Sequence, residues 1–154
     1  MQKSKELARR FREILLNGDW VVTTNYKDQL SDLTWQQATT KIGTLNTIAA
    51  LTFHINYYVA GILTVLEGGE LTIQDKYSFD FLPIESSNDW EQLMNKLWTD
   101  AEKFADLVEQ LPEEKLATEF GGKYGSYEKN INAMIEHSYY HLGQIILIRK
   151  MLTI

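Results

Sequence analysis

The stretch Ser126–Leu152, SYEKNINAMIEHSYYHLGQIILIRKML, decides the fold of this chain. Apolar residues recur in it at alternating spacings of four and three, which is the pattern of a helix packed in a bundle. Ser126 follows a glycine-containing turn and is a suitable N-cap. A second apolar stripe lies beside the first. We therefore expect this helix to be buried on more than one side, with a subunit interface as one candidate for the second side.

Three further stretches have helical periodicity, at residues 3–17, about 46–66 and about 88–111. The connection 68–87 is long enough to cross one end of a bundle, whereas simple up-down bundles use short loops. The sequence shows no internal repeat and no linker, so we expect one domain spanning 1–154. Together these patterns predict an all-α protein built as a four-helix bundle.

Composition limits the class of protein. The chain has 154 residues, of which 44% are hydrophobic and 23% charged, as in ordinary globular domains. The net charge of −6 disfavours a nucleic-acid partner, because nucleic acids are polyanions. The N-terminus lacks the apolar core of a signal peptide, and no stretch reaches the ~20 uninterrupted apolar residues of a membrane span. We therefore expect a cytoplasmic protein with no membrane contact.

The chain has three histidines and no cysteine. His137 and His141 are four residues apart, so a helix places both imidazoles on one face. His54 lies among the apolar residues of the second predicted helix. Three imidazoles from two facing helices can hold one divalent metal ion and leave a position for water or substrate. Because metal-binding imidazoles must be neutral, metal affinity is expected to fall below ~pH 6.5.

The three histidines are also compatible with roles that need no such metal. Histidines four apart occur in many helices without a metal, and a buried histidine can simply be held by hydrogen bonds. The zinc-protease pattern HExxH does not occur, since Glu136 precedes His137. A di-iron bundle needs a glutamate three residues before a histidine, but those positions are Met134 and Ser138. Haem is not excluded by the histidines, although there is no attachment motif.

Gln144 and Tyr58 are candidates for catalytic roles beside such a metal. Gln144 lies three residues after His141 and could orient a bound water or a substrate. Its alternative role is that of a polar residue ending the core stripe. Tyr58 lies one turn after His54 and could donate a hydrogen bond to a neighbouring group or a bound anion. Its alternative role is packing, with a hydrated hydroxyl.

Two segments carry a resemblance to a known family: NTIAALTFHINYYVAGIL at 46–63 and EHSYYHLGQIILIRKML at 136–152. With one histidine upstream of an HxxxHxxQ pattern, the chain resembles the DinB-like and YfiT-like family of small metal-binding bundles. The resemblance implies an up-down-down-up bundle in which His54, His137 and His141 hold one divalent ion. It implies nickel or zinc, with iron or manganese as alternatives, and a homodimer.

Characterised members of that family include thiol S-transferases that use bacillithiol and isomerases that depend on mycothiol. The resemblance therefore implies a metal-dependent transferase that acts on a small molecule with a low-molecular-weight thiol. Because the chain has no cysteine, the sulfur would come from outside. One alternative is a metal-dependent hydrolase, although the sequence shows no clear general base. The other is a non-catalytic dimeric bundle with a structural or sensory metal.

Overall fold

The structure, a computed structural model, describes residues 2–154. Its four long helices are α1 (Lys3–Arg12), α4 (Ile48–Leu66), α5 (Ser87–Gln110) and α7 (Tyr127–Met151). The shorter elements are the π-helical turn η1 (Glu13–Asn17), α2 (Tyr26–Leu30), α3 (Trp35–Thr39), η2 (Asp75–Tyr77), α6 (Glu113–Leu116) and η3 (Gly122–Tyr124). No β-strand forms among the described residues, which confirms the all-α prediction.

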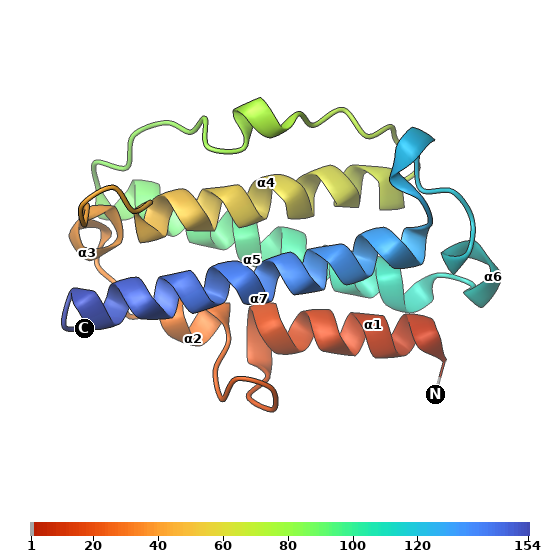
Figure 1. The fold of residues 1–154 in the computed structure, drawn as a ribbon, viewed down its shortest axis with the longest axis horizontal. Coiled ribbons are helices and arrows are strands. Elements are labelled where there is room, and N and C mark those ends of the chain that lie inside the picture. Colours follow the sequence, from red (N-terminus) through yellow and green to blue (C-terminus); the bar gives the residue numbers. More distant parts are fainter. Residues whose placement is uncertain (1) are drawn as a thin grey trace.

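The long helices pack side by side in the order α1, α5, α4 and α7 around the bundle (Figure 1). α4 and α5 run in the same direction, and α1 and α7 run in the opposite direction (Figure 1). The chain returns from the end of α4 to the start of α5 through residues 67–86, which we call the crossing segment. This arrangement is consistent with the up-down-down-up bundle that the resemblance implied.

α7 begins and ends where local chemistry favours it. The Ser126 hydroxyl accepts a hydrogen bond from the Lys129 amide at 3.2 Å, as predicted for the N-cap. Arg149 and Lys150 lie in the last turn, where cations interact favourably with the helix dipole. Between these ends, apolar residues such as Ile135 are fully buried. The helix therefore crosses the whole molecule with one side in the core.

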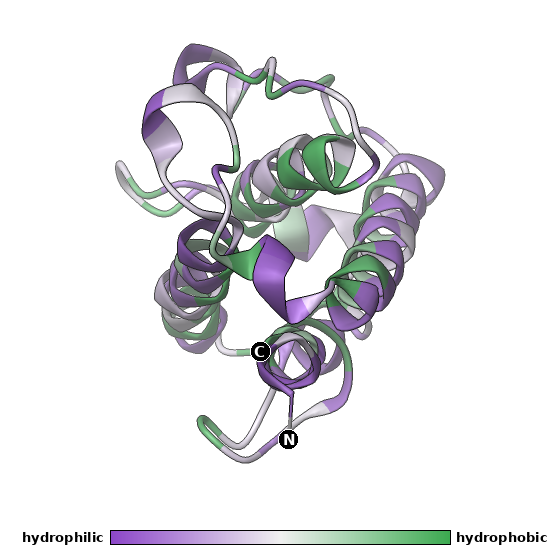
Figure 2. Cartoon of the chain, turned by 90° about the vertical axis from the view of Figure 1, so that its right-hand side faces the viewer, coloured by the Kyte–Doolittle hydropathy of each residue, from purple (hydrophilic) through white to green (hydrophobic). Residues whose placement is uncertain are grey.

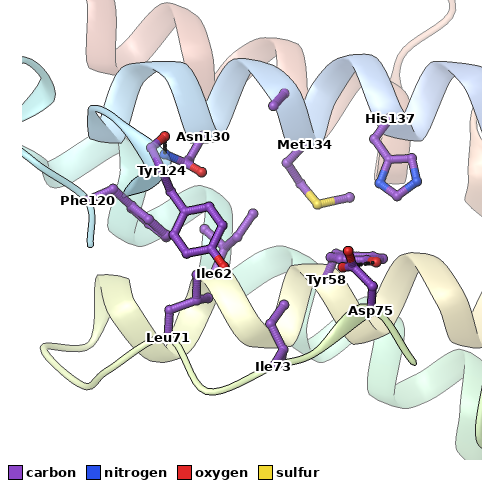
Figure 3. Close-up of a pocket in the computed structure, with 11 residues that line it drawn as sticks. Tyr58, Ile62, Leu71, Ile73, Asp75, Phe120, Tyr124, Asn130, Met134 and His137 are labelled. Carbon is purple, nitrogen blue, oxygen red and sulfur yellow. Dashed lines mark hydrogen bonds between the residues drawn. The ribbon is translucent and has the colours of Figure 1, made fainter. Parts of the chain in front are cut away.

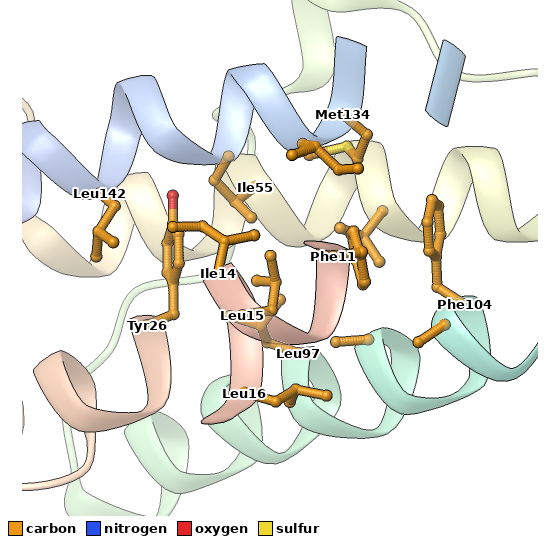
Figure 4. Packing of buried hydrophobic residues seen from close by; sticks show 14 of the residues in the cluster. Phe11, Ile14, Leu15, Leu16, Tyr26, Ile55, Leu97, Phe104, Met134 and Leu142 are labelled. Carbon is orange, nitrogen blue, oxygen red and sulfur yellow. The ribbon is translucent and has the colours of Figure 1, made fainter. Parts of the chain in front are cut away.

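Aliphatic and aromatic side chains fill the centre of the bundle (Figure 4). Phe11 of α1 stacks on Phe104 of α5, with 4.1 Å between ring centroids. Tyr26 of α2 is fully buried, and its hydroxyl donates to the Ser138 carbonyl oxygen of α7 at 2.8 Å. This bond satisfies the phenol inside an otherwise apolar region, where a free hydroxyl would be costly. It also fixes the short helix α2 against the middle of α7.

α4 is the central apolar helix of the bundle. By length and composition it could cross a membrane, but 67% of its apolar window is buried inside the protein. Apolar residues colour much of its ribbon in the view along the bundle (Figure 2). Burial on several sides is what a core helix requires, so its apolar character is explained by packing.

The crossing segment lies along α4 and is fastened to it. The Tyr57 hydroxyl accepts from the Gln74 amide and donates to the Gln74 carbonyl oxygen, both at 2.9 Å. At Gly61 a side-chain Cβ would lie 2.5 Å from Ile73 Cδ1, so only glycine admits the segment this close. These contacts hold the segment beside the part of α4 that carries His54.

Candidate metal centre

The structure brings the three histidines together between α4 and α7. The Nε2 atom of His137 lies 3.2 Å from Nε2 of His54 and 2.8 Å from Nε2 of His141. The three candidate ligand atoms all lie within 4.8 Å of one another. His54 and His141 are each only 7% exposed, and His137 is half-buried. Imidazoles from two helices thus converge on one point.

The outer nitrogens of two rings fix which nitrogen carries the proton. Nδ1 of His54 lies 3.3 Å from the Ser78 carbonyl oxygen, which can only accept a hydrogen bond. Nδ1 of His141 lies 2.6 Å from Oε1 of Gln144, again an acceptor. Both Nδ1 atoms therefore carry hydrogen, and both Nε2 atoms present lone pairs toward His137. A proton on Nε2 of His137 could donate to the Nε2 atom of His54 or to that of His141, but not to both.

Burial keeps the cluster neutral. It lowers the pKa of His137 from 6.5 to about 4, helped by repulsion from charge on His141 and His54. Burial is also the main cause that lowers the pKa of His54 and that of His141. Neutral imidazole is the form that binds metal ions, so the cluster is prepared for a cation at neutral pH.

The spacing of the nitrogens fits a small dication. Three ligands ~2.1 Å from a tetrahedral zinc ion would be ~3.4 Å apart. The distances from Nε2 of His137 are 2.8 and 3.2 Å, about 0.6 and 0.2 Å below that value, and all three nitrogens lie within 4.8 Å of one another. Converging lone pairs of neutral rings repel one another unless a proton or a cation lies between them. The residues therefore fit the divalent metal that the sequence predicted.

Gln144 contacts the cluster through a hydrogen bond to the ring of His141. We predicted from the sequence that it could orient a water or a substrate. In the structure its side-chain oxygen accepts from Nδ1 of His141. That contact directs Nε2 of His141 into the cluster, as outer partners of metal-binding histidines generally do.

Tyr58 lies beside the cluster and reaches a carboxylate. Its ring meets the rings of His54 and His137 edge-on, with 5.1 Å between centroids in each case. Its hydroxyl donates to Oδ1 of Asp75 in the crossing segment at 2.8 Å. Burial, followed by the bond to Asp75, raises the pKa of Tyr58. The hydroxyl thus stays protonated and holds Asp75 near the metal centre.

The crossing segment supplies neighbours that the sequence patterns did not predict. Besides Asp75 and the Ser78 carbonyl, Phe79 stacks on the His54 ring with 4.1 Å between centroids and 12° between planes. The sequence predicts this segment only as a connection, since it has no helical or strand periodicity. Its aromatic content was the one signal that could have pointed to packing on a functional site.

A pocket of about 190 Å³ adjoins His137 (Figure 3). Its walls come from α4, the crossing segment, the turn before α7, and α7 itself. The lining residues are Tyr58, Ile62, Leu71, Ile73, Asp75, Phe120, Tyr124, Asn130, Ala133, Met134 and His137. The metal centre is therefore reached from a half-open, mostly apolar pocket.

Comparison with known proteins agrees with this geometry. The family model described as the DinB superfamily matches residues 18–145, a range that contains all three histidines. No curated protein and no solved structure matches the chain. The match covers most of the chain and confirms the resemblance noted in the sequence. The chain belongs to the DinB superfamily.

Proposed function

We propose that the chain binds one divalent metal ion through His54, His137 and His141, and joins the sulfur of an external thiol to a small electrophile. The observation that carries this proposal is the convergence of three neutral imidazoles at the edge of a small pocket. Three protein ligands leave a dication one position for a further ligand. The pocket beside that position gives room for the second substrate.

A bound dication would supply Lewis acidity, lowering the pKa of a thiol at its open position. The protein's own groups hold the geometry. Gln144 and the Ser78 carbonyl accept the Nδ1 protons and so direct Nε2 of His141 and of His54 inward. Phe79 covers one face of the His54 ring and limits access of water from that side. Little reorganisation is then needed when a ligand arrives.

The proposed transfer replaces the leaving group of the electrophile with the sulfur of the thiol. The S–H bond of the thiol breaks, and its proton goes to the carboxylate of Asp75, which is exposed and can pass it to solvent. The sulfur electron pair forms the new S–C bond. The bond from that carbon to its leaving group breaks, and the leaving group departs with the electron pair. Since the chain has no cysteine, its own side chains offer no competing thiol.

The test compares two glutamine variants of neighbouring residues on α7. His137→Gln removes a proposed ligand, whereas Glu136→Gln changes an exposed residue and serves as the matched control. We expect elemental analysis to find close to one nickel or zinc ion per chain in the wild type and in the control, and a small fraction of that in His137→Gln. Thiol consumption with an electrophile such as 1-chloro-2,4-dinitrobenzene should fall in parallel.

Full metal content in His137→Gln would refute three-histidine ligation. Metal lost together with unchanged thiol consumption would refute a role for the metal in the reaction. Metal bound as expected with no thiol consumption over a panel of thiols and electrophiles would refute the transferase and leave a metal-binding bundle.

Metal-dependent hydrolysis is a second candidate, favoured by one observation. Asp75 provides the carboxylate base that the sequence patterns did not reveal, and it lies on the wall of the pocket that His137 also lines. In that reaction Asp75 would accept the proton of an attacking water. Ester cleavage that needs metal but no added thiol would support the hydrolase over the transferase.

A further inference from the structure

We infer that the pocket beside His137 binds one uncharged hydrocarbon group of the electrophile, an aromatic ring or a branched alkyl group of similar size. The inference rests on the proposed function, because it names the substrate class for that reaction. It is carried by the size of the pocket, the chemistry of its walls and the contacts that keep it open.

The size of the pocket limits the group that it can hold. Its volume is about 190 Å³. A dry cavity of ~150 Å³ in another protein is known to take up a benzene molecule. The pocket therefore has room for one six-membered ring with a small substituent. A larger group would have to extend out of the pocket through its open side.

The walls favour an uncharged occupant. Most of them are hydrocarbon, contributed by Ile62, Leu71, Ile73, Phe120 and Met134. Among the lining residues, all within the described part of the chain, no lysine or arginine is found, and the one carboxylate is Asp75. A carboxylate or phosphate on the electrophile would lose water and face this negative charge with no lysine or arginine in the lining to pair with it, and the one cation nearby would be the metal at the His137 edge.

The side-chain amide of Asn130 at the far end does not change this expectation. The side-chain amide of Asn130 already donates to the Tyr124 carbonyl oxygen at 3.0 Å and to the Ser126 carbonyl oxygen at 2.8 Å. Its hydrogens are therefore committed to the turn that begins α7. An anion placed there would find no free donor from this amide.

Contacts within the protein hold the walls of the pocket in place. Its wall in the crossing segment is held by the two bonds between Tyr57 and Gln74 and by the bond from Tyr58 to Asp75. Ile73 reaches its place because Gly61 leaves room for it on α4. A preformed site spends less of its binding free energy on ordering its own walls.

Ala133 offers a way to fill this pocket without touching the metal ligands. It lies on α7 one turn before His137, is exposed, and lines the pocket. Leucine at this position would add hydrocarbon to the space where the ring should sit. Glu136→Leu, which introduces the same side chain on an exposed position of the same helix, is the matched control.

The experiment titrates the full-length protein with 4-methylbenzyl alcohol, an uncharged probe, and measures its dissociation constant by calorimetry or ligand-observed NMR. Titrations are run with and without one equivalent of zinc chloride, and circular dichroism checks the fold of each variant. We expect Ala133→Leu to weaken binding at least about tenfold, because two or more buried carbons of the probe lose their site. Glu136→Leu should bind the probe like the wild type.

A second probe, 4-methylbenzoate, tests the exclusion of anions. Zinc could attract its carboxylate directly, so we expect any binding of this probe to be unaffected by Ala133→Leu. Equal affinity for both probes, with the same loss in Ala133→Leu, would overturn the uncharged class. An unchanged dissociation constant for the alcohol in Ala133→Leu would refute binding in this pocket. Alcohol binding that is lost in this variant, with no thiol consumption, would keep the pocket and refute only the transferase.

Discussion

Metal affinity should fall with pH, and the expected size of this fall differs between histidines of ordinary pKa and the buried histidines of the structure. The perturbation is a change from pH 6 to pH 5. If all three histidines had the ordinary pKa of 6.5, the neutral fraction of each would fall ~8-fold over this interval, and that of all three together ~500-fold. Metal affinity would fall by the same factor, because each ligand must lose its proton before it binds.

The structure predicts a much weaker response. With its pKa lowered to about 4, His137 remains mostly neutral at pH 5 and loses only ~10% of its neutral form. Even if the other two rings kept ordinary values, the combined factor would be ~70-fold. Burial lowers the pKa of His54 and of His141 as well, so the weakening should be smaller than this limit.

The assay is a competition titration of zinc against a chromophoric chelator at pH 5.0, 5.5 and 6.0 and at constant ionic strength. The chelator is corrected for its own protonation, and circular dichroism confirms that the protein is folded at each pH. A dissociation constant that rises less than ~70-fold agrees with the buried cluster. A rise near ~500-fold would show three ordinary histidines and would refute the effect of burial argued from the structure.

Three predictions concern stability. Tyr26→Phe removes the donor to the Ser138 carbonyl oxygen and should lower the free energy of unfolding by about 1 kcal/mol, measured by urea denaturation, with metal content unchanged. Phe104→Ala opens a cavity at a fully buried ring and should cost about 3–5 kcal/mol in the same assay; a loss below about 1 kcal/mol would contradict the packing. Arg149 donates to Asp32 at 2.7 and 3.1 Å, and this hydrogen bond lowers the pKa of Asp32. The resulting stability is present above the unfolded pKa and lost as pH falls through the folded one. Because Asp32 is 62% exposed, Asp32→Asn should cost only about 0.5 kcal/mol at pH 7, and the difference from wild type should shrink as the pH falls below 3.8.

Periodicity in the sequence was enough to find the long helices and the face on which each histidine lies. The predicted start of the second helix was two residues early, since Thr47 rather than an earlier residue caps α4 through the Ala50 amide. The order of the bundle came from the resemblance, which the family match confirms, whereas the three histidines were candidate ligands from their spacing alone. The homodimer and the cytoplasmic location stay predictions.

The surroundings of the metal centre could not be predicted in the same way. Asp75, Ser78 and Phe79 belong to a segment without regular period, so no pattern shows which of them faces α4. Their positions depend on contacts between residues about twenty positions apart, such as Tyr58 with Asp75. The lowered pKa of His137 likewise comes from burial by the assembled bundle, which spacing along the chain does not reveal.

The location of the histidines in the chain bears on the order of folding. His137 and His141 come together as soon as one helix forms, but His54 is 83 residues away from His137 along the chain. Contacts over such a separation form late, because a long loop must close first. A partly folded chain in which only α7 has formed would bind cations weakly, because His137 and His141 would be its only two ligands. Tight metal binding would therefore indicate that the long-range contact between His54 and His137 has formed.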